Sequence, residues 1–191
     1  MFFRRVSPVL AWLGWIVAAL VPGTALAKVG IGDPFPTWTL LDLAGNEVHL
    51  GSEDRVCLLY FLGSGCTLCA DLASRIDTDF VQGFTTADVG VYAIDSLDGT
   101  VDELERLRNE AGVRFPFLRD GSELTAACGI SWHAIVVLDD RGTIRYLTEG
   151  ANAGIYDPSG LRETIDHLLG HAAETRSATW GAIKRLYDDT R

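Results

Sequence analysis

The pattern with the clearest chemical potential is a pair of cysteines separated by two residues. Cys66 and Cys69 follow a glycine-rich turn at 63–65 and stand where a helical pattern begins. The first turn of a helix has unpaired backbone N–H groups and the positive end of the helix dipole, and both favour a thiolate over a thiol. We therefore expect Cys66 to be the attacking sulfur and Cys69 to be the more buried, resolving sulfur of a dithiol–disulfide exchange.

Three other interpretations of the cysteine pair remain open. A permanent structural disulfide would close a four-residue loop, which removes little chain entropy and so stabilises a fold only slightly. Half of a zinc site would need a second C-x-x-C or an H-x-x-x-H at finger spacing, which the sequence lacks. Inert cysteines in a regulatory or docking domain are the third alternative.

The first 27 residues have the features of an export signal. Two arginines within the first five residues precede an apolar run at 9–21, and Ala25 and Ala27 supply small residues before a cleavage point. This order predicts a cleaved secretory signal peptide at 1–27, because the apolar run is short for a bilayer span. An uncleaved membrane anchor is the alternative. We expect a periplasmic protein, in which a thiol pair has a redox role.

Composition restricts the class of protein further. The chain has 191 residues, of which 48% are hydrophobic and 22% charged, as expected for one globular domain. The net charge of −10 argues against a nucleic-acid partner, since such proteins carry basic surfaces that neutralise phosphates. Four cysteines are too few for a disulfide scaffold. The acidic stretch at 95–105 is expected to be a solvated surface.

Apolar periodicity predicts alternating strands and helices. Residues 55–62 are apolar on both faces, as a covered central strand requires. The other predicted strands are 38–43 and 47–50, which form a hairpin, then 89–94, 134–138 and 143–147. Helices are predicted at 66–80, 101–110, 120–128 and from the Asp157-Pro158 cap to Gly170. In the first helix, Leu68, Leu72, Ile76 and Phe80 recur at the i, i+4 spacing of a buried face.

Several short motifs resemble the redoxin group, which includes the AhpC/TSA peroxiredoxins and the TlpA/ResA-type thioredoxin-like proteins. The matching residues are Gly32-Asp33-Pro34-Phe35-Pro36, Tyr60-Phe61, Cys66-Thr67-Leu68-Cys69, Phe115-Pro116-Phe117-Leu118 and Val137-Leu138-Asp139. The resemblance implies a thioredoxin-like three-layer α/β fold, with a mixed central sheet and an extra N-terminal β-hairpin. We expect this redoxin domain at 28–170 and a C-terminal helical extension at 171–191.

The resemblance also implies an activity and partners. It predicts a periplasmic thiol–disulfide oxidoreductase that acts as a reductant, without a cofactor, on disulfide-bearing periplasmic proteins. Proteins of this group are typically re-reduced by a membrane thiol donor of the DsbD/CcdA type.

His133 marks a departure from that group. Thioredoxin-like proteins place a cis-proline opposite the cysteine pair, but no proline lies between Pro116 and Pro158. Counting back from Asp139 puts His133 at that position, whereas counting from Gly129 puts Ala134 there. His133 could be a packed side chain or could move a proton during exchange. It could also join Cys66 and Cys69 in a Cu(I) site like that of Sco-type copper metallochaperones.

Two further alternatives concern the cysteines. A peroxiredoxin-like thiol peroxidase needs P-x-x-x-T/S-x-x-C, and neither Cys66 nor Cys69 ends such a motif. Cys57 and Cys128 are expected to be small buried residues. They could instead form a second disulfide, or Cys128 could exchange with Cys66.

Overall fold

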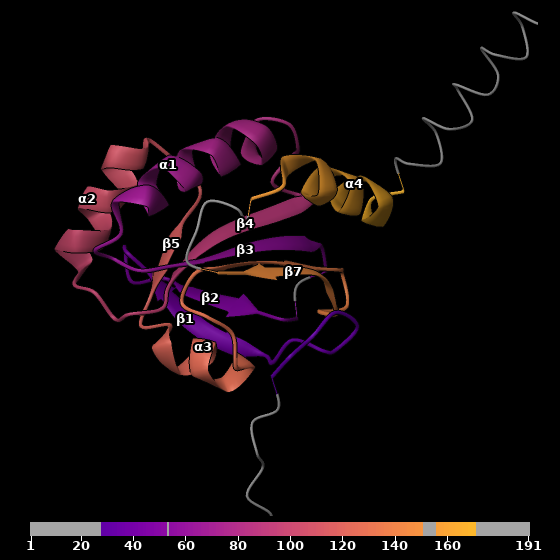
Figure 1. Ribbon diagram of the computed structural model, residues 1–191, viewed down its shortest axis with the longest axis horizontal. Helices are drawn as coiled ribbons and strands as arrows, with labels where there is room; N and C mark the ends of the chain where they lie inside the picture. The colour runs from indigo at the N-terminus through magenta and orange to yellow at the C-terminus, as the bar shows by residue number, and fades with distance from the viewer. Residues whose placement is uncertain (1–27, 53, 151–155, 171–191) are drawn as a thin grey trace, which may run out of the picture.

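The computed structural model describes residues 28–52, 54–150 and 156–170, which form one mixed β-sheet with helices on both faces (Figure 1). The predicted signal peptide at 1–27 and the predicted helical extension at 171–191 lie outside the described residues. Within the described residues, none of the helices has the length and apolar character needed to cross a membrane.

The strands and helices follow the predicted order, except that the short strand β5 was not predicted. The strands are β1 (Trp38–Asp42), β2 (Glu47–Leu50), β3 (Val56–Leu62), β4 (Val89–Asp95), β5 (Phe117–Arg119), β6 (Ala134–Leu138) and β7 (Ile144–Glu149). The helices are α1 (Thr67–Ile76), which continues into the π-helical turn η1 (Asp77–Val81), then α2 (Val101–Ala111), α3 (Ser122–Cys128) and α4 (Pro158–Leu168).

Sheet topology places β3 near the centre. The strand order is β2-β1-β5-β4-β3-β6-β7. Strands β3, β4 and β5 run parallel, whereas β6 pairs antiparallel with β3 and β7 antiparallel with β6. The hairpin β1–β2 joins the sheet through an antiparallel pairing of β1 with β5. The predicted mixed sheet with an added N-terminal hairpin is therefore confirmed.

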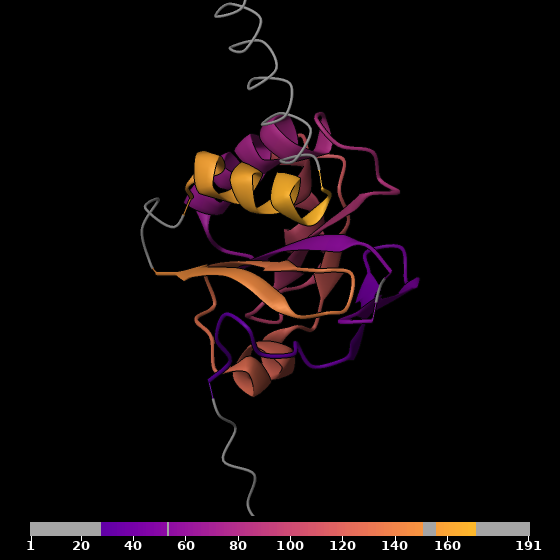
Figure 2. The same ribbon diagram turned by 90° about the vertical axis from the view of Figure 1, so that its right-hand side faces the viewer.

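The sheet divides the core into two apolar layers. Side chains of β3 alternate between them, because successive residues of a strand point to opposite faces. Leu58 and Tyr60 pack toward α1, α2 and α4, whereas Leu59 and Phe61 pack toward α3 and the N-terminal segment. Figure 2 shows these helices on opposite sides of the sheet. All seven residues of β3 are buried, so the predicted covered strand is confirmed.

Two helices begin at capping residues, of which the Asp157-Pro158 cap was predicted. Asp157 accepts hydrogen bonds from the backbone N–H groups of Ser159 and Gly160, with Pro158 in the first turn of α4. At α2, Thr100 and Glu103 form a reciprocal capping box, which satisfies two N–H groups at the helix start. These caps fix where α2 and α4 begin against the sheet.

Two details of the predicted first helix are wrong. The expected helix at 66–80 changes at its end into the π-helical turn η1, in which the N–H of Gln82 bonds to the carbonyl of Asp77. Leu68, predicted on the buried face, is 60% exposed. Leu68 lies in the first turn of α1, just after the turn that follows the C-terminal end of β3. Leu72 and Ile76, further along the helix, are part of the core.

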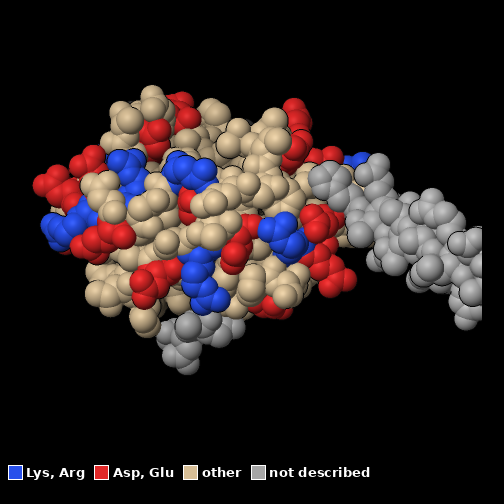
Figure 3. All heavy atoms as spheres, turned by 90° about the horizontal axis from the view of Figure 1, so that it is seen from above, with Lys and Arg blue, Asp and Glu red and all other residues tan. Residues whose placement is uncertain are grey.

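Charges of both signs are distributed over the helical surface. Figure 3 views the molecule from the side of α1 and α4, and there the Lys and Arg side chains are interspersed with Asp and Glu. No continuous basic stripe crosses the described part of this face. The described surface that carries α1 therefore combines small groups of both charges with areas that carry no Lys, Arg, Asp or Glu.

Candidate active site

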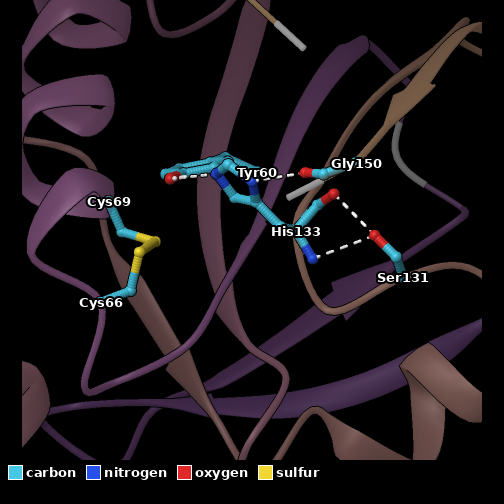
Figure 4. The surroundings of a disulfide bond; sticks show 6 residues. All are labelled: Tyr60, Cys66, Cys69, Ser131, His133 and Gly150. Carbon is cyan, nitrogen blue, oxygen red and sulfur yellow. Dashed lines mark hydrogen bonds between the residues drawn. A yellow bond between two sulfur atoms is a disulfide. The ribbon is translucent and has the colours of Figure 1, made fainter. Parts of the chain in front are cut away.

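Cys66 and Cys69 form a disulfide at the N-terminus of α1 (Figure 4). Cys66 is the N-cap residue with an extended backbone and is half-buried, whereas Cys69 is fully buried one turn later. Their Cα atoms are 5.2 Å apart. The predicted difference in exposure is confirmed: the sulfur at the helix terminus is the one that a partner can reach.

A glycine turn carries the chain from β3 to Cys66. The backbone N–H of Cys66 donates to the carbonyl of Gly63 at 3.1 Å, which closes the turn. A Cβ atom on Gly63 would lie 2.6 Å from Leu97 and 3.4 Å from Trp132. Any larger residue at this position would require the exposed Leu97 side chain to move, because real Cβ atoms essentially never come within 3.0 Å of another heavy atom.

His133 precedes β6 and lies on the side of the sheet that carries α1. Ala134 is the first residue of β6 and pairs with Phe61, so His133 immediately precedes the strand. Its ring lines a groove together with α1 residues, including Leu68 and Leu72. Of the two positions that the sequence left open, the structure assigns this place to His133.

Hydrogen bonds fix the orientation of the His133 ring. Nδ1 lies 2.7 Å from the carbonyl oxygen of Gly150, which can only accept, so Nδ1 carries a proton. In the neutral ring Nε2 then accepts a hydrogen bond from the Tyr60 hydroxyl at 3.3 Å. Figure 4 shows this pair beside the disulfide. His133 is only 4% exposed, so protein groups rather than water surround its ring.

Tyr60 is a site residue that the sequence analysis did not identify. Strand alternation places it on the α1 side of β3, where it is fully buried and where burial raises the pKa of its phenol above the usual range. The phenol is therefore a hydrogen-bond donor at neutral pH. The sequence did contain a signal for this role: Tyr60 carries a hydroxyl within a strand of otherwise apolar residues. A buried hydroxyl needs a hydrogen-bond partner.

The geometry does not assemble a metal site. No three His, Cys, Asp or Glu side chains within the described part of the chain are grouped so that they could hold a metal ion. The copper alternative built on Cys66, Cys69 and His133 would need the dithiol form, because the thiolate is the metal ligand and both sulfurs are joined in a disulfide.

Cys57 and Cys128 are buried thiols that take no part in a disulfide. Burial raises the pKa of the Cys128 thiol to about 12, so it stays protonated at neutral pH. The expectation of small buried residues is confirmed, and the alternative of a second disulfide between them is not what the structure contains.

Asp95 contradicts the expected solvated acidic stretch. It ends β4 and is 1% exposed, and its neighbour Ser96 is buried as well. Burial raises the pKa of the Asp95 carboxyl, although hydrogen bonds from backbone N–H groups oppose that shift. The stretch was assigned to the surface because of its charge, but β4 extends one residue further than predicted and carries Asp95 inside.

Exposed apolar side chains gather around the disulfide. Leu68, Leu97 and Trp132 are 60%, 57% and 38% exposed. Leu68 lies between the two cysteines, and Leu97 and Trp132 both lie against Gly63. These three side chains form an apolar rim beside the turn that leads to half-buried Cys66.

Comparisons with known proteins agree with this geometry. A model of the AhpC/TSA family matches residues 31–147. A candidate protein disulfide isomerase from Bacteroides thetaiotaomicron has a similar structure, with a TM-score of 0.65 and 26% identity over 76% of this chain and 95% of that one. The sequence has no significant match among curated proteins.

Two structures from Mycobacterium tuberculosis show the same fold at lower identity. A secreted disulfide oxidoreductase homologous to Escherichia coli DsbE has a TM-score of 0.55 and 17% identity over 68% of this chain and 95% of that one. The AhpC protein has a TM-score of 0.62 and 15% identity over 75% and 94%.

Proposed function

The chain belongs to the AhpC/TSA family and is a thioredoxin-like oxidoreductase, and from this premise we propose that it is an exported reductant of protein disulfides. The observation that carries the proposal is the Cys66–Cys69 disulfide at the N-terminus of α1, with one sulfur half-buried and the other buried. The apolar rim beside the turn that leads to Cys66 favours a protein substrate, because a polypeptide offers apolar side chains next to its own cysteines.

The reductive cycle starts from the dithiol form. The Cys66 thiolate attacks one sulfur of the substrate disulfide, and a mixed disulfide forms while the first substrate thiolate leaves and takes up a proton. Cys69 then loses its proton and attacks the Cys66 sulfur, which releases the second substrate thiolate. The substrate gains two electrons, and the protein is left with the Cys66–Cys69 disulfide.

We assign the proton of Cys69 to Nε2 of His133. Nδ1 of His133 is occupied by the carbonyl of Gly150, so Nε2 is the nitrogen with a lone pair. When the Tyr60 hydroxyl turns away, Nε2 can accept the thiol proton and pass it to the leaving thiolate. Cys66, Cys69 and His133 are thus the proposed catalytic residues.

The location and the electron source form the second half of the proposal. Residues 1–27 carry the order of charged, apolar and small residues of an export signal, which favours the periplasm. In that compartment the disulfide form must be returned to the dithiol by a membrane thiol donor of the DsbD/CcdA type. The similarity to a secreted disulfide oxidoreductase supports this location.

Trapping of mixed disulfides tests the proposal. Cys69→Ser removes the resolving sulfur, so partners should remain bound to Cys66 through bonds that dithiothreitol cleaves. Cys66→Ser should trap nothing and should not reduce insulin disulfides, whereas the wild-type dithiol should reduce them. A folded Cys69→Ser protein without trapped periplasmic partners would contradict the proposal. Consumption of hydrogen peroxide or tight 1:1 binding of Cu(I), with negligible disulfide reduction, would favour the peroxidase or the metallochaperone instead.

A further inference from the structure

A buried carboxylate lies directly behind the loop that carries Cys66. Asp95 is the last residue of β4 and pairs in register with Leu62, the last residue of β3. Both strands are parallel, so their carboxyl ends meet at one edge of the sheet. The glycine turn to Cys66 starts at this edge, immediately after Leu62.

The Asp95 carboxylate connects two loops through backbone N–H groups. One oxygen accepts from Gly99 at 2.5 Å and the other accepts from Leu97 at 3.3 Å, both in the β4–α2 loop. A third hydrogen bond comes from the N–H of Ser64, in the turn before Cys66. The Cα atoms of Ser64 and Cys66 are at most about 7.6 Å apart, since only one residue separates them.

Close packing holds the same two loops together. A Cβ atom on Gly99 would lie 2.2 Å from both the Cβ and the Oγ of Ser64. The loop between β5 and α3 also contacts Asp95, because the N–H of Gly121 donates to the backbone carbonyl of Asp95 at 2.8 Å. The carboxylate is therefore enclosed by backbone, and the charged side chain that acts on it is Asp98, a second acid.

We propose that Asp95 is a positioning residue for disulfide exchange, which anchors the turn before Cys66 and places a fixed negative charge behind that sulfur. The inference rests on the proposed function and adds a reason for the reductant direction. A negative charge close to Cys66 disfavours its thiolate. The dithiol form is destabilised relative to the disulfide, so the pair gives up its electrons more readily.

The test compares two variants, each of which removes one negative charge. Asp95→Asn removes the buried charge, whereas Asp98→Asn removes an exposed one three residues away. Each protein is equilibrated with reduced and oxidised glutathione, and the ratio of dithiol to disulfide is measured. Asp95→Asn should shift the equilibrium constant toward the dithiol roughly threefold to tenfold, where tenfold corresponds to about 30 mV. Alkylation of Cys66 by iodoacetamide should reach half its maximal rate at a lower pH.

A shift below twofold in a folded Asp95→Asn protein, or an equal shift in Asp98→Asn, would overturn the proposal. This result differs from failure of the proposed function, in which the wild-type dithiol does not reduce insulin even though its glutathione equilibrium is measurable.

A measurement on the wild-type chain keeps the proposal testable if Asp95→Asn does not fold. Coupling between two charges is reciprocal, so a Cys66 thiolate must also disfavour the Asp95 carboxylate. Carboxyl-carbon NMR of the dithiol form should show a second, smaller change of the Asp95 resonance over the pH range in which Cys66 ionises, and the disulfide form should lack this change. Identical titration curves in the two forms would rule out the proposed coupling.

Discussion

The hydroxyl of Tyr60 donates a hydrogen bond to Nε2 of His133, which immediately precedes β6, at 3.3 Å. Both side chains are buried, and the other ring nitrogen of His133 is bonded to the carbonyl of Gly150. Neutral His133 therefore presents its one lone pair toward the interior, on the α1 side of the sheet. Its placement makes His133 a candidate proton acceptor that is oriented before a substrate arrives.

Replacement of His133 tests this role. His133→Ala should slow insulin reduction at pH 7 by at least about tenfold, because Cys69 loses its proposed proton acceptor. Tyr60→Phe is the matched variant: it keeps the ring, removes the hydrogen bond to Nε2 and leaves the base in place, so it should retain most of the rate. Urea unfolding should verify that both proteins are folded. Equal rates for His133→Ala and the wild type would exclude the proton role.

A second prediction concerns the two cysteines outside the disulfide. The double variant Cys66→Ser/Cys69→Ser retains only Cys57 and Cys128. Burial raises the pKa of Cys128 to about 12, so at pH 8 only about one molecule in 10⁴ carries a thiolate there. The folded double variant should give no rapid reaction with Ellman's reagent, and both thiols should react once guanidinium unfolds the chain. Rapid reaction of either thiol in the folded protein would show that the buried layer around α3 opens.

Local patterns were sufficient to predict most of the fold. β3 is apolar on both faces and was therefore identified as a central strand, and the Asp157-Pro158 cap correctly marked the start of α4. Such features depend on neighbours along the chain, which a single sequence displays. The buried position of Cys69 relative to Cys66 followed from the same logic, because a helix that packs on a sheet turns its second cysteine inward.

What the sequence did not predict depends on contacts between distant segments. β5 has only three residues and follows Pro116, so its pattern is too short to identify a strand without β1 and β4 beside it. Asp95 is buried because backbone N–H groups from two loops surround its carboxylate. The partner of Tyr60 comes from a residue 73 positions away, which no local spacing reveals.

The junction between η1 and β5 supplies a third prediction. The Asp77 carboxylate is buried and accepts from the backbone N–H of Arg114 at 2.9 Å and from its guanidinium at 3.0 Å. Asp77→Ala leaves these donors without their acceptor and should lower the free energy of unfolding by about 2 kcal/mol. Arg114→Ala should cost less, since its side chain is 57% exposed and the backbone hydrogen bond remains. Urea denaturation measures both, and a larger loss for Arg114→Ala would contradict the assignment.

The β6–β7 turn predicts how stability changes in acid. Burial acts to raise the pKa of Asp139, but N–H groups of Thr143 and Arg141 and the Arg145 guanidinium outweigh it and lower the pKa below the usual 3.8. The unfolded chain therefore binds a proton at this carboxylate more readily than the folded chain. The contribution of Asp139 to the free energy of unfolding is complete above about pH 5, and it is lost as the pH falls below 3.8 toward the folded-state pKa. Asp139→Asn should lower the free energy of unfolding by about 1–2 kcal/mol at pH 7 and should lose less further stability on acidification than the wild type.

Asp140→Asn, at the exposed neighbour, should leave the wild-type pH dependence unchanged. Urea unfolding between pH 7 and pH 2.5 measures all three proteins, and parallel curves for Asp139→Asn and the wild type would show that Asp139 is not responsible.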